Sequence, residues 1–167
     1  MPKTPEESTK KNESNLIRKR DLKKAEALNY SIDKNVCAKS FLDFYLNEVK
    51  NYQLRQNQIT TLKTLLNANN KAVHIWGIRD AEKLIASLVW LKDNNRITYL
   101  LPIATKKAKV NGLPTLLIST LVTEFQKSNL LLDFEGSMID GVGSFYKSFG
   151  SEKEQYNNLC KKLLQEI

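Results

Sequence analysis

The sequence predicts an α/β fold with a mixed sheet, because the spacing of its apolar residues changes twice along the chain. Apolar residues first recur at helical spacing, then gather in three short runs between polar turns, and finally follow the order helix, strand, helix. A helix that connects two neighbouring strands makes them parallel, with a right-handed connection. We therefore expect a mostly antiparallel sheet that contains one parallel pair.

Helices are expected before the sheet. Residues 16–28 form a basic, weakly amphipathic pattern, and a short extended piece follows at 30–32. Aromatic residues at helical spacing predict a second helix over 39–52, which lays one stripe on a core. A third, shorter helix has its apolar positions at Ile59, Leu62 and Leu65/Leu66.

Three short strands should come next, over 72–78, 84–91 and 97–101. The first is rich in β-branched and aromatic residues, which favour strands. Tight polar turns at 79–82 and 92–95 separate the three runs. This spacing predicts an antiparallel meander.

The remaining elements supply the parallel strand. Residues 102–112 read as a basic loop, and Pro114 stands where a helix begins, since its missing N–H costs nothing there. A compact apolar strand is expected over 130–134 and a short helix over 142–149. The strand over 97–101 and the strand after the crossover helix then form the parallel pair.

Composition is that of an ordinary globular domain. The 167 residues are 41% hydrophobic and 26% charged, which suits one domain with a buried core. Residues 1–15 are polar and predict a disordered lead-in, so that a single domain covers 16–167. The apolar runs are too short to cross a bilayer and no signal peptide is readable, so we expect a cytoplasmic protein without membrane insertion.

The net charge of +8 points to an anionic partner. Basic residues gather at 18–24, at 106–109 and at 161–162. RNA and phosphate-bearing ligands are candidate partners, and a solvated lysine surface is the alternative. One histidine and two cysteines are too few for a zinc site, so no metal is expected, and we expect Cys37 and Cys160 to be buried thiols.

A pattern near the end of the chain resembles a known family. Leu-Leu-Leu-Asp-Phe-Glu-Gly-Ser at 130–137 is followed by Gly-Val-Gly-Ser-Phe-Tyr-Lys-Ser-Phe-Gly at 141–150. Together they resemble the strand and short helix of Fem-type acyltransferases, which belong to the GNAT-like superfamily. Residues 18–25 look like the family's basic helix, and residues 87–91 with 97–101 look like its central hairpin.

The resemblance implies a GNAT-like fold, in which a mixed, mostly antiparallel sheet has helices on both faces and one splayed parallel pair. It implies transfer of an acyl or aminoacyl group from a thioester or ester donor to an amine. The donor would be acyl-coenzyme A or an aminoacyl-tRNA, and neither would be permanently bound. Family members commonly carry two such domains, and this chain resembles the C-terminal one. A second GNAT-like domain or a homodimer is therefore an expected partner.

The resemblance also places the donor where the parallel strands diverge, because unpaired N–H and C=O groups there can bind its amide arm. Leu100 and Leu101 are the expected positions. Donor phosphates would lie at the N-terminus of the following helix, where free N–H groups favour anions. The loop before it supplies Lys106, Lys107, Lys109 and Gly112. The usual coenzyme A loop, (Gln/Arg)-x-x-Gly-x-(Gly/Ala), is absent, and a lysine loop also suits tRNA phosphates.

Four residues are candidates for the chemistry. In the family motif a lysine after the first Phe steadies the charge that develops in acyl transfer. Counted back from Gly150, the shorter spacing places Tyr146 there, and Lys147 lies one residue later, rotated by about 100° on a helix. Tyr146 would then act as a neutral hydrogen-bond donor. Asp133 and Glu135 are candidate general bases, and the alternative is that Asp133 caps the following turn while Glu135 is solvated.

Two functions stay open from the sequence. One is an enzyme, or half of one, that transfers an acyl or aminoacyl group to an amine. The other is a non-catalytic GNAT-like module that binds a partner domain, RNA or another anionic ligand through its basic face. The missing donor loop and the position of Tyr146 favour the module, whereas the strand and helix motifs favour the enzyme only as far as its fold. The enzyme requires an open slot between diverging strands.

Overall fold

The computed structural model describes residues 17–48, 54–68, 71–135 and 140–153. Residues 17–26 are helical, and we call this segment the N-terminal helix. The elements that follow are β1 (Ile32–Asp33), α2 (Ala38–Glu48), α3 (Gln56–Asn67), β2 (Val73–Asp80), β3 (Lys83–Lys92), β4 (Arg96–Ala104), α4 (Lys106–Val110), α5 (Leu113–Phe125), β5 (Leu131–Asp133) and α6 (Asp140–Lys147).

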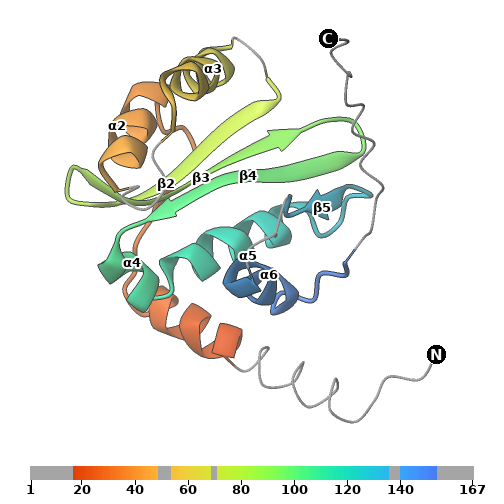
Figure 1. Ribbon diagram of the computed structural model, residues 1–167. Coiled ribbons are helices and arrows are strands. Elements are labelled where there is room, and N and C mark those ends of the chain that lie inside the picture. Colours follow the sequence, from red (N-terminus) through yellow and green to blue (C-terminus); the bar gives the residue numbers. More distant parts are fainter. Residues whose placement is uncertain (1–16, 49–53, 69–70, 136–139, 154–167) are drawn as a thin grey trace, which may run out of the picture.

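The five strands form one sheet in the order β1-β2-β3-β4-β5. The pairs from β1 to β4 are antiparallel, and β5 runs parallel to β4 after the α5 crossover. Figure 1 shows α2 and α3 on one face of the sheet and α5 and α6 on the other. The predicted mixed sheet with one parallel pair and helices on both faces is therefore confirmed.

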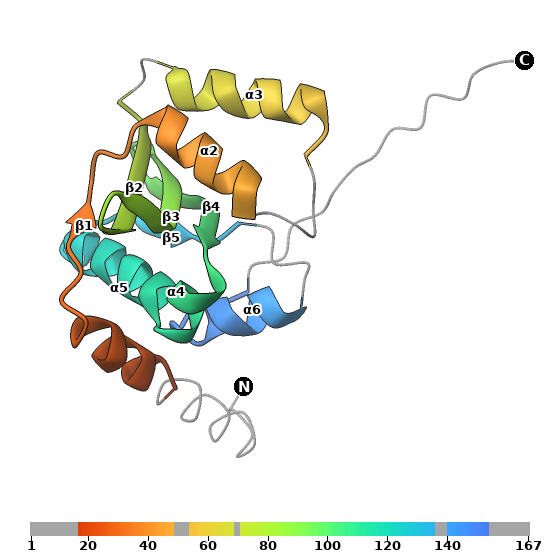
Figure 2. The same ribbon diagram turned by 90° about the vertical axis from the view of Figure 1, so that its left-hand side faces the viewer.

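Each face of the sheet has its own hydrophobic core. The core under α2 and α3 is built around Phe41, Tyr45 and Val89, all buried. The core under α5, α6 and the N-terminal helix is larger and contains Trp76 and Trp90. Strand side chains alternate between the faces, so the central strands contribute to both cores and hold the two helical layers to one sheet. In Figure 2 the N-terminal helix lies beside α4 and α5.

The prediction of a loop over 102–112 is wrong in two places. β4 continues to Ala104, and its register explains why Pro102 is tolerated. The Thr105 N–H donates to Ile85 O at 2.9 Å, so the alternating register directs the backbone groups of residue 102 away from β3. A proline there costs no hydrogen bond between the two strands. The second error is α4, which begins because the Thr105 hydroxyl accepts the Ala108 N–H at 3.1 Å.

The prediction of buried cysteines is wrong for Cys37, which is exposed. It precedes α2 and acts there as a cap, with its Sγ 3.5 Å from Ser40 N. Cys160, the predicted lead-in over 1–15 and the end of the predicted helix over 39–52 lie outside the described residues. Within the part of the chain that the structure describes, no helix combines the length and the apolar character needed to span a bilayer.

Candidate functional site

The parallel strands diverge soon after they pair. β4 and β5 are in register at three positions, Arg96 with Leu131, Ile97 with Leu132 and Thr98 with Asp133. β5 then ends, while β4 runs on to Ala104. The register against β3 shifts between Val89 and Trp90, which leaves Leu100 as an extra residue in β4. Such a bulge bends the strand that carries it, so β4 turns away from β5.

A cavity of about 430 Å³ lies against the free half of β4. Its walls come from β4, the start of α5, α6 and the N-terminal helix, and Ser87 of β3 also lines it. Among the described residues that line it, none belongs to β5. The slot is therefore open along β4 and is closed on the other side by helices instead of by the partner strand.

The β4 edge that faces the cavity carries few hydrogen-bond donors. In the alternating register, the backbone N–H and C=O groups of residues 103 and 105 point toward β3. Those of residues 102 and 104 therefore point toward this edge. Pro102 has no N–H, so residue 102 offers only its carbonyl there. Ala104 has both backbone groups. A bound chain would thus meet carbonyl acceptors at two positions and a backbone donor at one.

An aromatic cluster fills the space between the cavity and β5. Phe134 stacks on Tyr146, with ring centroids 4.6 Å apart, and Tyr99 meets both rings edge-on at 5.4 and 5.7 Å. Phe145 and Phe149 extend the cluster along α6. Tyr99, Phe145 and Tyr146 also line the cavity, so its apolar wall is a continuation of the core.

The two tyrosines keep their protons at neutral pH. Burial raises the pKa of Tyr146 above its ordinary value near 10. Burial, and then the neighbouring Tyr146, raises the pKa of Tyr99 well above that value. A phenol held neutral in this way can donate a hydrogen bond or a proton to a charge that develops in the cavity.

The four chemical candidates from the sequence do not meet at one point. Tyr146 is buried and lines the cavity, whereas Lys147 is exposed, as one helical step predicts. Asp133 binds Arg96 through a contact of 2.5 Å between Oδ2 and Nη1 and accepts the Glu135 N–H at 2.9 Å through Oδ1. Glu135 is exposed. The positions of the two carboxylates thus fit the turn-capping alternative better than a base.

The expected phosphate loop satisfies its own backbone. Within α4 and its ends, the N–H groups of Ala108 and Lys109 donate to Thr105, and those of Asn111 and Gly112 donate to Lys107 and Lys109. Gly112 is buried, with φ at +74°. These amides are therefore not free to bind an anion.

The lysines of that loop and the two leucines of β4 point in different directions. Lys109 lines the cavity, while Lys106 and Lys107 are exposed on the outer side. The side chains of Leu100 and Leu101 pack into the core under α2 and α3, on the opposite face of the sheet. Of the six positions expected to bind the donor, the structure brings the Lys109 side chain to the cavity.

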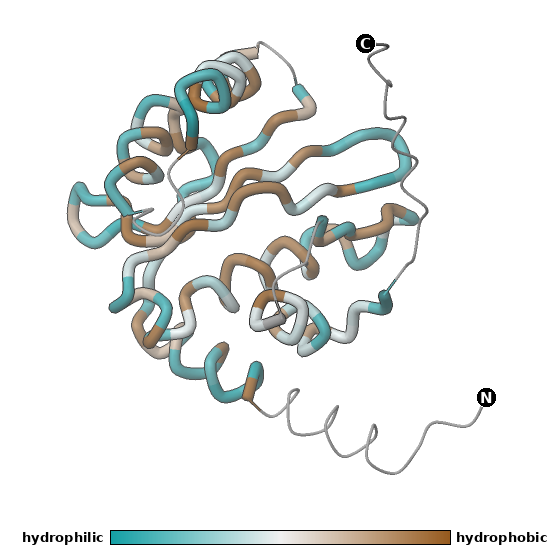
Figure 3. The backbone as a smooth tube through the Cα atoms, in the orientation of Figure 1, coloured by the Kyte–Doolittle hydropathy of each residue, from teal (hydrophilic) through white to brown (hydrophobic). Residues whose placement is uncertain are grey.

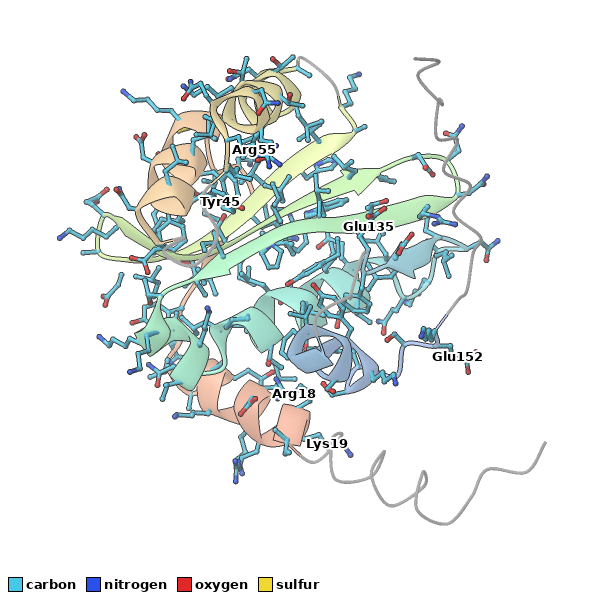
Figure 4. The ribbon with its side chains drawn as sticks, in the orientation of Figure 1. Arg18, Lys19, Tyr45, Arg55, Glu135 and Glu152 are labelled. Carbon is cyan, nitrogen blue, oxygen red and sulfur yellow. The ribbon has the colours of Figure 1, made fainter. Side chains whose placement is uncertain are left out.

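Arg18 and Asp21 of the N-terminal helix line the cavity, and sequence reasoning missed them. Arg18 Nη1 donates to Thr115 Oγ1 at 3.2 Å and lies 3.1 Å from Asp21 Oδ2. Its guanidinium carbon lies 4.8 Å from the centre of the Phe145 ring. The signal in the sequence was the spacing of three residues, which places the two charges on one side of a helix. Figure 4 shows Arg18 on the side of this helix toward α6.

His74 is a packing residue. Its ring stacks on Trp90, with centroids 4.0 Å apart. Burial, and then the charge of Lys92, lowers the pKa of His74, so it is neutral at pH 7. It does not line the cavity. Within the described ranges, no group of three His, Cys, Asp or Glu residues is placed to hold a metal ion.

No protein-family model matches the sequence, and no curated protein matches it. Solved structures do match the fold. A possible acetyltransferase from Clostridium difficile 630 aligns with a TM-score of 0.63 and 13% identity, over 81% of this chain and 99% of that one. The ribosomal-protein-alanine N-acetyltransferase from Brucella melitensis biovar Abortus 2308 aligns with a TM-score of 0.60 and 12% identity, over 80% and 99%.

A third structure, AAC(6')-Iy in complex with the bisubstrate analog CoA-S-monomethyl-acetylneamine, aligns with a TM-score of 0.58 and 8% identity, over 81% of this chain and 99% of that one. Identities this low establish the fold alone. The chain therefore has the same fold as these N-acetyltransferases, which confirms the predicted fold class. The narrower relation to the C-terminal domain of Fem-type enzymes stays a prediction.

Proposed function

We propose that this chain is an N-acyltransferase that binds acyl-coenzyme A in the cavity beside β4 and transfers the acyl group to an amine. The observation that carries the proposal is the cavity of about 430 Å³ at the point where β4 leaves β5. The bisubstrate analog bound by AAC(6')-Iy contains coenzyme A, which supports the same donor class here. We also propose that the chain acts in the cytoplasm, as expected from the sequence.

The proposed reaction needs a neutral hydrogen-bond donor at the departing sulfur. The amine nitrogen attacks the thioester carbonyl carbon, the C–N bond forms and the C–S bond breaks. The proton that the amine loses ends on the sulfur. We assign Tyr146 to this step, because its phenol is held neutral by burial and lines the cavity. It can donate to the thiolate as the charge forms and then regain a proton from the ammonium group.

The charged end of the donor would be bound by side chains. Four of the loop amides donate within α4 and its ends, and Pro114 removes one N–H from the first turn of α5. Arg18 and Lys109 are the cationic side chains among the residues that line the cavity. We therefore assign donor phosphates to these two cations, and this differs from the amide cradle expected from the sequence.

The bonded loop amides also favour a second function. A loop whose amides are already bonded binds an anion poorly. A non-catalytic module that retained the fold would have such a loop. In that case the cavity binds a small ligand or an acyl chain without transfer. The Fem-type reading is the narrower form of the first function, with an aminoacyl-tRNA as donor and a second domain as partner.

Ligand-dependent stability separates these functions. The melting temperature is measured with acetyl-coenzyme A, with desulfo-coenzyme A and with a charged tRNA, and acetyl transfer to a panel of amines is followed in parallel. A ligand at 100 times its Kd stabilises the folded state by about 2.7 kcal/mol. We expect both coenzyme A compounds to raise the melting temperature and acetyl-coenzyme A to be consumed. Stabilisation without transfer would support the module, and no stabilisation by any donor would refute the transferase.

A further inference from the structure

A basic face lies beside the cavity, on the N-terminal helix and α4, and shares Lys109 with the cavity lining. We define it by seven exposed cations, which are Lys19, Arg20, Lys23, Lys24, Lys106, Lys107 and Lys109. The two segments are far apart in the sequence but in contact in the fold, because Lys24 Nζ donates to Val110 O at 2.8 Å. Figure 2 shows the two segments side by side below the sheet.

The two sides of the N-terminal helix differ sharply in burial and charge. Its inner side is formed by Arg18, Asp21, Leu22 and Ala25, which are buried or half-buried against the domain. Its outer side presents the four cations of the basic face. Figure 3 shows this helix as strongly hydrophilic, with the apolar colour confined to isolated positions. Figure 4 places Lys19 on the outer side.

This arrangement opposes the local stability of the helix. Lys19 with Lys23 and Arg20 with Lys24 are like-charge pairs four residues apart, and each such pair destabilises a helix by about 0.2–0.5 kcal/mol. An ordinary solvated helix would alternate acids with bases on this side. Among the described residues, Lys107 is the member of the basic face with a carboxylate in ion-pair range, Asp80 at 3.6 Å. Apart from Lys107, the cations of the basic face therefore have no carboxylate in ion-pair range among the described residues.

The chemistry of the face fits a phosphate polymer. A single coenzyme A tail would meet Lys109 and Arg18 at the cavity and would leave the outer cations unused. Six of the seven cations are lysines, which bind phosphates as point charges, and no aromatic residue belongs to the face. Single strands are usually bound by stacking their bases on aromatic side chains. Double helices, in contrast, present a dense row of backbone phosphates.

A membrane surface fits less well. Helices that bind in the lipid interface lay an apolar side into the acyl boundary. Here the corresponding side of the N-terminal helix is packed on the protein, where Ala25 is fully buried and Gly112 lies directly beneath the Asp21 backbone.

We propose that the basic face binds the phosphate backbone of a double-helical nucleic acid. The binding is sequence-indifferent and depends on the lysines of both segments. It does not rest on the proposed transferase activity, because a non-catalytic module with the same surface would bind in the same way.

Fluorescence anisotropy with labelled 20-base-pair RNA and DNA duplexes tests the proposal, at salt concentrations from about 50 to 200 mM. The test variant is Lys19→Glu/Lys23→Glu/Lys106→Glu. The matched control is Lys39→Glu/Lys63→Glu/Lys71→Glu, which changes the net charge equally at exposed positions away from the basic face. Thermal melts confirm that both variants fold.

We expect the unmodified chain to bind at least one duplex, with an affinity that falls steeply as salt rises. The test variant should lose at least about tenfold in affinity, and its salt slope should fall by about three, one for each lysine removed. The control should retain its salt slope. The RNA and DNA arms decide which duplex is preferred. Equal loss in both variants would show an effect of net charge and would overturn the proposal. Absence of duplex binding, or binding only to anionic vesicles, would overturn it as well.

Discussion

Tyr146 combines three properties at the residue scale. It is buried, it lines the cavity, and its ring is held between Phe134 and Tyr99. The ring contacts position the hydroxyl, and the hydroxyl is the part that the proposed chemistry uses. A substitution that removes the hydroxyl alone therefore separates packing from catalysis.

Tyr146→Phe should reduce kcat by a factor of about 10²–10³, since a positioned acid or hydrogen-bond donor typically contributes about 10²–10⁴. KM for the donor and the melting temperature should change little, because the ring contacts remain. Steady-state kinetics and a thermal melt measure both quantities. Lys147→Met serves as the control, because Lys147 is exposed beside it. A greater loss of kcat in the control than in Tyr146→Phe would contradict the assignment.

Tyr99 should limit stability at high pH. Burial raises its pKa well above 10, so its neutral form is favoured in the folded state. In the unfolded chain the phenol ionises near pH 10, and the unfolded state therefore gains stability above that pH. The free energy of unfolding should be constant between pH 8 and 9.5 and should fall as the pH rises beyond 10. Urea titrations at each pH, compared with Tyr99→Phe, test this. An equally steep fall in the variant would exclude Tyr99 as the cause.

Cys37 should react faster than an ordinary thiol. Hydrogen bonding with the Ser40 side chain and then with its backbone N–H lowers the pKa of Cys37. Burial opposes this shift, and the charge of Arg79 adds a smaller lowering. In a Cys160→Ser background, the rate of alkylation by iodoacetamide at pH 7.5 should exceed that of a free cysteine peptide. Ser40→Ala should slow it. The same rate in Ser40→Ala and the parent would show that Ser40 is not responsible.

At the scale of elements, the predicted and observed boundaries agree where a single apolar pattern defined the element. The predicted strands over 84–91 and 130–134 became β3 and β5 within a few residues. The loop predicted over 102–112 failed, because Pro102 and three lysines suggested irregular backbone. Tertiary pairing decided otherwise. Because of the alternating register, Pro102 removes no hydrogen bond between β3 and β4. The Thr105 cap begins α4, a helix that no pattern of apolar residues predicted.

The candidate site was predictable in its position but less so in its contents. The crossover helix predicted that β4 and β5 pair in parallel, and the resemblance to the GNAT-like fold implied that this pair diverges. Tyr146 was identified from a motif. Arg18 and Asp21 were not, because their spacing indicates only that they share one side of a helix. The contact from Arg18 to Thr115, across almost a hundred positions, leaves no local pattern.

The junction between the N-terminal helix and α5 depends on Gly112. Its φ is +74°, and a Cβ there would lie 2.4 Å from Asp21 O. Gly112→Ala should therefore lower the free energy of unfolding by at least about 2 kcal/mol, from left-handed strain and overpacking together. The control Gly141→Ala has no atom within 4 Å of the new Cβ and should be neutral or slightly stabilising. Urea unfolding of both variants decides the matter, and equal stabilities would refute the close packing of these two elements.

At the scale of the whole molecule, the features on which the proposals rest lie on one side of the sheet. α2 and α3 close a core of their own, with exposed helical surfaces of ordinary composition. The opposite side combines the cavity, the aromatic cluster and the basic face. The N-terminal helix takes part in two of these features, since its inner side lines the cavity and its outer side forms most of the basic face.

Arg18 ties that helix to the rest of the molecule, because it contacts α5 through Thr115 and α6 through Phe145. Arg18→Ala should lower the free energy of unfolding by about 1–2 kcal/mol, a range reduced from that of buried charged hydrogen bonds because the side chain is 22% exposed. It should also weaken acetyl-coenzyme A binding at least tenfold, since a cavity wall and a cation are lost together. Arg20→Ala, on the outer side of the same helix, removes the same charge and should leave both quantities nearly unchanged. Calorimetry measures the affinity for acetyl-coenzyme A, and urea unfolding measures the stability. An equal loss of affinity in the two variants would mean that the helix contributes only long-range charge to the cavity.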